Sequence, residues 1–300
     1  MPDYKYNTSK PEKLLTGYGT VRGAELKSIY TDIEPMTPLS QIENRFGRPS
    51  SSGLETDHID NCLRFLRTID MIEQTEKDVL KTMNRDIFPE FELSFEPKLL
   101  HHIQRQTGKQ SHLAAVYEIA VQEILSDTGH YGVRRVSVDD LVIKVDRETD
   151  YDLEWREEKI LMWTNLLAPL GAISFSSDHD EILLSPSRAV LHELLSHHQR
   201  HRANGDTILA ALEWIDGNFF PVFSRTGGQP AVHVGVADVL ESLVADGVLS
   251  LTGMSDRSEV VDLPTSIDDS ETPADYTIEA APDKPSYWYP LDSSERRYKA

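Results

Sequence analysis

The chain has 300 residues, of which 39% are hydrophobic, with 50 acidic and 30 basic side chains. That length predicts two or three domains, and the apolar content is sufficient for packed cores, which excludes wholesale disorder. No apolar run approaches the ~20 residues needed to span a bilayer, and the first residues lack the apolar core of a secretion signal, so we expect a cytoplasmic protein. The single cysteine, Cys62, excludes an intramolecular disulfide and is expected to be buried in a helix.

The net charge of -20 is unevenly distributed along the chain. Residues 1–110 hold 15 bases and 17 acids, whereas residues 111–300 hold 15 bases and 33 acids. The acidic, lysine-poor composition resembles that of cytoplasmic proteins from salt-accumulating archaea. At about 1 M salt the Debye length is ~3 Å, so net charge by itself does not exclude DNA binding. The nearly neutral first third is expected to contact a partner that the acidic remainder of the chain does not contact.

The first module is predicted at residues 24–95, after a flexible lead at 1–23. Apolar residues recur with helical spacing in three stretches, which are 24–33, 38–46 and 57–66. Thr37 is expected to cap the second helix, with Pro38 at its first position. The serine- and glycine-rich residues 47–53 predict a turn before the third helix.

The end of the first module is predicted to form a β-ribbon. Residues 71–73 follow the third helix as one strand, and the alternation at 91–95 predicts the returning strand. Residues 76–83 between them are expected to form a helical insertion. A linker helix is predicted at 96–110.

The second module is predicted at residues 111–185 and is followed by a linker helix at 186–205. Ser137 is expected to cap the second helix of this module. Its ribbon is the clearest of the three, because apolar alternation at 172–175 and 181–184 flanks a polar turn.

The third module is predicted at residues 206–263, with Asp206 as the cap of its first helix. Its ribbon is expected at 248–251 and 259–263. Acids, serines and prolines dominate from 264 to 300, which predicts a disordered acidic tail.

An aromatic cluster interrupts this acidic tail at Tyr287, Trp288 and Tyr289. Aromatic side chains dominate the energetics of protein interfaces, so these residues are expected to anchor a partner. The alternative is that the segment folds back onto the third module.

Each predicted module ends in the same pattern, in which an apolar helix is followed by a break and then by a short strand. The break lies at Asp70, Gly171 or Gly247, residue types that tolerate the left-handed backbone of a helix C-terminus. The pattern resembles the junction between the third helix and the wing of winged-helix (winged helix-turn-helix) proteins. This resemblance implies an α+β, mainly α fold of three tandem winged-helix modules with small β-wings. It also implies DNA binding, or protein contact through the same surface.

The winged-helix resemblance directs attention to the exposed face of each third helix, because that helix enters the major groove in modules that bind DNA. In the first module this face and the preceding turn carry hydrogen-bond donors, so DNA contact is expected there. The candidate residues are Arg45, Arg48, His58, Asn61, Arg64 and Arg67. The alternative interpretation is an ordinary solvated helix face.

The other two modules carry acids where DNA phosphates would lie. These are Glu154, Glu157 and Glu158 in the second module and Asp238 and Glu241 in the third. We therefore expect these modules to contact protein partners or a second copy of the chain.

No enzymatic or metal-binding motif is complete in the sequence. His192 and His197 are five residues apart, which places them on different faces of a helix, whereas zinc ligands of this kind need a spacing of four. His197 and His201 have that spacing but lack a third ligand, and a basic helix end is the simpler interpretation. The glycines at 17–23 lack the ending of a phosphate-binding loop. We expect no enzyme, cofactor or metal.

The sequence thus predicts a DNA-associated protein, either a transcriptional regulator or a subunit of a DNA-handling complex. Tandem winged-helix subunits of chromosome-organising ATPase complexes have a similar architecture. The alternative function is a pure protein scaffold or adaptor, of the chromosome-organising or defence type, that never touches nucleic acid.

Overall fold

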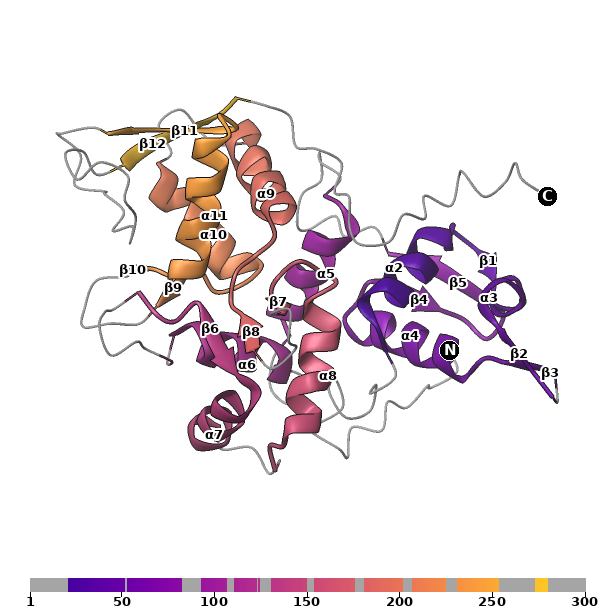
Figure 1. Ribbon diagram of the computed structural model, residues 1–300. Helices are drawn as coiled ribbons and strands as arrows, with labels where there is room; N and C mark the ends of the chain where they lie inside the picture. Colours follow the sequence, from indigo (N-terminus) through magenta and orange to yellow (C-terminus); the bar gives the residue numbers. More distant parts are fainter. Residues whose placement is uncertain are drawn as a thin grey trace.

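The computed structural model describes residues 21–51, 53–82, 93–106, 111–122, 124, 131–149, 154–175, 181–201, 207–224, 231–253 and 273–279. Within these ranges it contains ten helices and five small sheets, so the prediction of a mainly helical α+β chain is confirmed. Figure 1 shows three groups of elements, which we call the first unit (residues 21–82), the second unit (111–184) and the third unit (188–279).

The first unit combines three helices, a three-stranded sheet and a hairpin that precedes the third helix. Its elements are α2 (Gly23–Asp32), β1 (Thr37–Pro38), α3 (Leu39–Phe46), β2 (Arg48–Ser50), β3 (Gly53–Glu55), α4 (Asp57–Thr68), β4 (Ile72–Gln74) and β5 (Asp78–Lys81). The sheet order is β1-β5-β4, so the last strand lies between the other two. Leu26, Ile42 and Ile59, one from each helix, are fully buried in one core with Val79 of β5.

Two predictions for the strands of the first unit are wrong. The helical insertion predicted at 76–83 is wrong at Asp78–Lys81, because these residues form β5 and pair with β1 and β4, while residue 83 lies outside the described residues. Thr37 and Pro38 belong to β1 and pair with β5, so α3 begins one residue later, at Leu39. The turn predicted at 47–53 overlaps the hairpin formed by β2 and β3, which extends to Glu55.

Helix α5 (Phe95–Gln104) follows the first unit and agrees with the linker helix predicted at 96–110. The returning strand predicted at 91–95 is wrong at Phe95, which begins this helix, and β5 takes the place of that strand. Residues 91 and 92 lie outside the described residues. Almost every side chain of α5 is buried, because α6, α9 and α10 pack against it.

The second unit repeats the order of elements in the first, without the extra hairpin. It contains α6 (His112–Gln122), β6 (Arg135–Ser137), α7 (Val138–Glu148), α8 (Glu157–Leu167), β7 (Ser174–Phe175) and β8 (Glu181–Leu183). The sheet order is β6-β8-β7. Ser137 Oγ accepts a hydrogen bond from the Asp140 N–H at 3.0 Å, which confirms the predicted cap. The two predicted ribbon strands correspond to β7 and β8.

The third unit contains α9 (Arg188–His201), α10 (Ile208–Asn218), β9 (Phe223–Ser224), β10 (Ala231–Val232), α11 (Val234–Ala245), β11 (Leu249–Gly253) and β12 (Pro273–Ile278). A hairpin of β9 and β10 separates α10 from α11, so this unit differs from the other two. Helix α9 was predicted as a linker, yet it packs against α10, α11 and β12. The cap of α10 is Thr207, whose side chain accepts the Ala210 N–H.

All three helix-to-strand junctions have the predicted backbone. Asp70, Gly171 and Gly247 have φ angles of 62°, 69° and 69°, in the left-handed region. At Gly171 a Cβ would also lie 2.5 Å from Ser187 Oγ, so a side chain there meets a steric obstacle. The local sequence signal therefore identified the end of α4, α8 and α11 correctly.

Strand β12 lies within the tail predicted to be disordered, so that prediction is wrong for residues 273–278. It pairs with β11 from Leu249 opposite Ile278 to Gly253 opposite Pro273. Tyr276 is fully buried, and its hydroxyl lies 2.7 Å from His198 Nδ1 on α9. The partner strand predicted at 259–263 lies outside the described residues.

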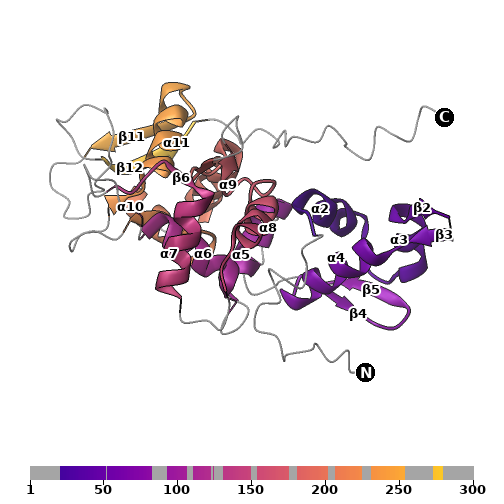
Figure 2. The same cartoon turned by 60° about the horizontal axis from the view of Figure 1, so that its bottom comes forward.

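The units are joined by close contacts between helices. Figure 2 shows α5 and α8 beside α2, at the boundary of the first unit. Lys27 of α2 forms an ion pair with the buried Glu96 of α5 at 2.7 Å. Both the backbone N–H and the hydroxyl of Ser94 donate to the Glu193 carboxylate of α9. These contacts tie the first unit to α5 and α5 to the third unit.

Candidate nucleic-acid interface

Helix α4 carries most of the residues predicted to contact DNA. Its predicted apolar face is confirmed, because Ile59, Leu63 and Leu66 are buried. Cys62 is also fully buried, and this burial raises the pKa of its thiol to about 12. The thiol is therefore protonated at neutral pH, so Cys62 is not an activated nucleophile.

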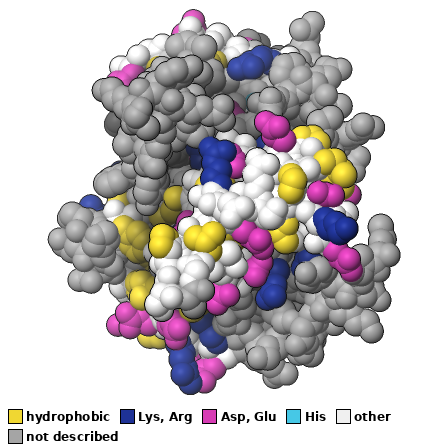
Figure 3. All heavy atoms as spheres, turned by 90° about the vertical axis from the view of Figure 1, so that its right-hand side faces the viewer, with side chains coloured by type: hydrophobic (Ala, Val, Ile, Leu, Met, Phe, Trp, Pro, Cys, Tyr) yellow, Lys and Arg dark blue, Asp and Glu magenta, His cyan; other side chains and the backbone are white. Residues whose placement is uncertain are grey.

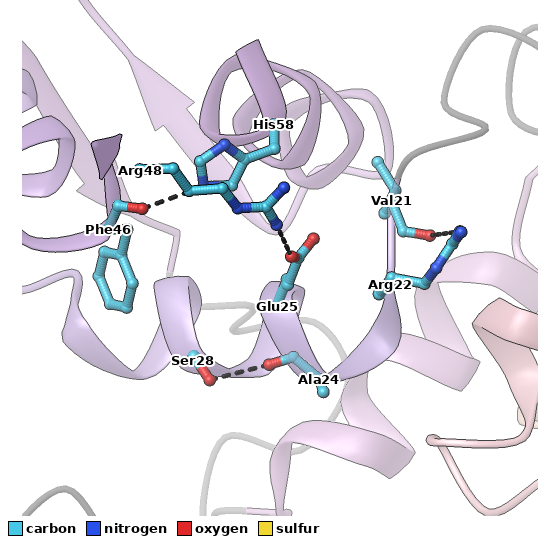
Figure 4. Close-up of polar contacts among 8 residues, drawn as sticks. All are labelled: Val21, Arg22, Ala24, Glu25, Ser28, Phe46, Arg48 and His58. Carbon is cyan, nitrogen blue, oxygen red and sulfur yellow. Dashed lines mark hydrogen bonds and ion pairs between the residues drawn. The ribbon is translucent and has the colours of Figure 1, made fainter. Parts of the chain in front are cut away.

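His58 does not lie on the exposed face of α4, so this part of the predicted site is wrong. Its side chain is only 8% exposed, and its Nε2 lies 3.0 Å from the Phe46 carbonyl oxygen (Figure 4). The spacing of four between His58 and Cys62 places both on one helical face, a signal that the sequence already contained. His58 connects the first turn of α4 to the end of α3.

Arg64 and Arg67 are the remaining bases on α4. Arg64 is exposed, whereas Asn61 and Arg67 are half-buried. A spacing of three residues places Asn61, Arg64 and Arg67 along one side of the helix. Acids lie beside them, since Asp57 and Asp60 are in the first turn of α4 and Asp70 follows the end of the helix. The surface of α4 is thus mixed in charge.

Arg45 and Arg48, the two predicted DNA contacts outside α4, are both paired with acids. Arg45 forms an ion pair with Asp32, and Arg48 forms one with Glu25, as Figure 4 shows for the second pair. Both acids belong to α2, so the pairing depends on how α2 packs against α3 and α4. Sequence reasoning missed it because the partners are distant along the chain.

The hairpin of β2 and β3 projects from this region with both of its faces exposed. Leu54 on β3 is 50% exposed, and Met36, just before β1, is 58% exposed. Figure 3 views the molecule from the side of the first unit. In that view basic side chains alternate with acidic and hydrophobic ones, and the described residues form no continuous basic patch.

The acidic positions predicted in the other two units are partly neutralised by bases. Glu154 is exposed beside Arg156, whose guanidinium holds the pKa of that carboxyl below its usual value. Asp238 of α11 forms an ion pair with Arg134 of the second unit. In the third unit, residues 207–224, 231–253 and 273–279 contain no Lys or Arg. The described bases of this unit, Arg188 and Arg200, both lie on α9, and Arg188 forms an ion pair with Asp246.

The histidines of α9 pack against aromatic rings. The rings of His197 and His201 are 4.7 Å apart, and His197 stacks on Trp214 of α10 at 5.8 Å. Burial, together with the nearby His201 and Arg200, lowers the pKa of His197 to about 4. His197 is therefore uncharged at neutral pH and adds nothing to a basic helix end. Within the described residues, no three His, Cys, Asp or Glu side chains form a metal-binding group.

Tyr287, Trp288 and Tyr289, predicted to bind a partner, lie outside the described residues. Among the helices that the structure describes, none has the length and apolarity required to cross a membrane.

Searches of protein-family models, curated proteins and solved structures give no match to this chain. Any proposal on its function therefore depends on the residues and geometry described above.

Proposed function

We propose that the chain is a non-enzymatic, DNA-associated protein of three winged-helix units, in which the first unit contacts duplex DNA. The connectivity of the first two units supports this fold. Apart from the β2–β3 hairpin of the first unit, a helix, a strand, two helices and two strands follow one another in each, and the last strand lies between the two other strands of its sheet. The third unit keeps a helix, α11, followed by the paired strands β11 and β12, although the β9–β10 hairpin lies between α10 and α11.

The observation that carries the DNA proposal is the position of Arg64 and Arg67. They lie on α4, the helix that precedes the antiparallel ribbon of β4 and β5. In helix-turn-helix proteins the equivalent helix lies in the major groove. Arginine there binds guanine edges or phosphates through paired N–H donors. An exposed Arg64 is suited to this contact.

The second and third units are proposed to contact proteins or a second copy of the chain. Their exposed helices carry acids, and in the described part of the third unit the bases are confined to Arg188 and Arg200 of α9, of which Arg188 is paired with Asp246. Non-specific DNA affinity depends on such cations, because each phosphate contact releases counterions. An acidic surface of this kind is better suited to a basic protein surface.

The proposal is tested by fluorescence anisotropy of a labelled duplex, with the full chain measured over a series of salt concentrations. Arg64→Ala and Arg67→Ala are each expected to weaken binding by about fivefold or more, and the salt slope of log K is expected to become shallower by about 0.9 per lost contact. Arg147→Ala, which removes an exposed arginine of the second unit, is the matched control and is expected to have no effect. Absence of salt-dependent binding, or unchanged binding in both α4 variants, refutes the proposal.

A protein scaffold without nucleic-acid contact is the second candidate function. It is favoured by the pairing of Arg45 and Arg48 with acids, and by large exposed apolar side chains such as Leu54 and Ile143. Purification from the native host after nuclease treatment separates the two functions. A stoichiometric protein partner that survives nuclease, combined with no duplex binding by the purified chain, supports the scaffold.

A further inference from the structure

Helix α2 carries two carboxylates that face the arginines of the α3–β2 segment. Glu25 and Asp32 are seven residues apart, close to two helical turns, so they lie on the same side of α2. Asp32 pairs with Arg45 in the last turn of α3, and Glu25 pairs with Arg48 at the start of β2. One helix face therefore engages both of the predicted DNA-contacting arginines that precede α4.

The two pairs have the same asymmetry in burial. The side chains of Arg45 and Arg48 are 41% and 56% exposed, whereas those of Asp32 and Glu25 are 13% and 29% exposed. The arginines thus lie at the surface, and their partners lie beneath them. The second oxygen of each carboxylate, Asp32 Oδ2 and Glu25 Oε2, is buried without a hydrogen-bond partner among the described residues. Each carboxylate is consequently only partly satisfied.

The position of this segment next to α4 is fixed by His58. Its Nε2 contact with the Phe46 carbonyl joins the first turn of α4 to the residue that follows Arg45 (Figure 4). Arg45 and Arg48 therefore lie beside the N-terminal end of α4. That end of a recognition helix approaches the bases and the flanking phosphates in helix-turn-helix proteins.

We infer that Glu25 and Asp32 act as internal substitutes for DNA phosphates, occupying Arg48 and Arg45 and thereby limiting the affinity of the first unit for DNA. This inference rests on the proposed function. To bind a phosphate, each arginine has to leave a carboxylate that is more buried than itself. The abandoned carboxylate then loses its partner, which is unfavourable for a partly desolvated charge. Exchange of one anionic acceptor for another thus adds little to affinity.

Neutralising the carboxylates is expected to release the arginines for DNA. Glu25→Gln and Asp32→Asn remove the charge and keep the side-chain size. We expect each variant to bind the duplex about fivefold more tightly, which corresponds to the upper end of the strength of a partly exposed ion pair. The salt slope of log K is expected to steepen by about 0.9 for each released arginine. Glu34→Gln removes the charge of an exposed acid next to α2 and is the matched control, for which no such change is expected.

A double variant separates release of an arginine from a general loss of negative charge. In Glu25→Gln combined with Arg48→Ala, the gain in affinity and in salt slope is expected to disappear, because no arginine remains to be released at that position. Thermal unfolding of each variant verifies that the fold is retained. Glu25 is the more exposed of the two acids, so its variant serves if Asp32→Asn fails to fold.

The outcomes distinguish this inference from the proposed function. If the unmodified chain binds DNA through Arg64 but Glu25→Gln and Asp32→Asn bind no tighter than Glu34→Gln, the inference is overturned and the proposed function stands. If neither the unmodified chain nor any variant binds duplex DNA, both are overturned. Weak binding by the unmodified chain that becomes strong in the two neutralised variants supports both.

Discussion

Replacing Gly235 with alanine is expected to weaken the junction between the second and third units. Gly235 lies in the first turn of α11, and a Cβ placed on it would lie 1.9 Å from the Leu184 carbonyl oxygen. Its own carbonyl accepts a hydrogen bond from Ser185 Oγ at 2.8 Å. The obstructing atoms belong to the backbone directly after β8 and cannot rotate away. We therefore expect the free energy of unfolding to fall by about 3 kcal/mol, the upper end for overpacked interiors.

Urea unfolding followed by circular dichroism measures this loss. Gly217→Ala is the control, because Gly217 lies in α10 and no atom stands within 4 Å of its added Cβ. Alanine is the better helix former, so this control is expected to be unchanged or up to about 1 kcal/mol more stable. If Gly235→Ala unfolds at the same urea concentration as Gly217→Ala, α11 does not approach Leu184 this closely in solution and the described junction is incorrect.

Two further predictions concern buried polar groups of the third unit. Tyr276→Phe removes a hydroxyl that lies 2.7 Å from His198 Nδ1, so the free energy of unfolding is expected to fall by about 1–2 kcal/mol. An unchanged midpoint of urea unfolding would contradict the described burial of Tyr276 on β12. Burial also lowers the pKa of His233, which caps α11, to about 4. Because His233 takes up a proton near pH 6.5 in the unfolded chain but not in the folded one, its contribution to stability does not change with pH above that value. It falls as the pH is lowered toward 4, by on the order of 3 kcal/mol for this group. His233→Asn keeps a side-chain acceptor for the helix cap and is expected to make urea unfolding less dependent on pH. If this variant shows the same pH dependence as the unmodified chain, the lowered pKa of His233 is refuted.

Features that depend on a few neighbouring residues were predictable from the sequence. The left-handed junctions at Asp70, Gly171 and Gly247 were identified because a helix end requires a residue that tolerates this backbone. The Ser137 cap was found for a similar local reason. The short strand β1 was not, since two residues carry no periodicity and Pro38 is equally suited to the start of a helix.

Features that depend on distant residues could not be read from local patterns. The pairing of β11 with residues 273–278 requires a partner beyond a polar stretch of sequence that favoured disorder. The ion pairs of Arg45 and Arg48 require knowing which face of α2 meets α3, and no local pattern specifies this. The prediction of a helix with a buried apolar face at 57–66 is confirmed, whereas His58 is buried and the two flanking arginines are paired with acids. Contact of this helix with DNA stays a prediction.

The late position of β12 in the chain has a consequence for biosynthesis. Helices α9, α10 and α11 are complete in sequence once Ala245 has been synthesised, but the place of Tyr276 beside α9 stays unoccupied until about thirty more residues have been added. During that interval the nascent third unit exposes apolar surface next to the ribosome, which is the condition under which chaperones bind folding intermediates. The first unit, whose strands close by Lys81, has no comparable delay.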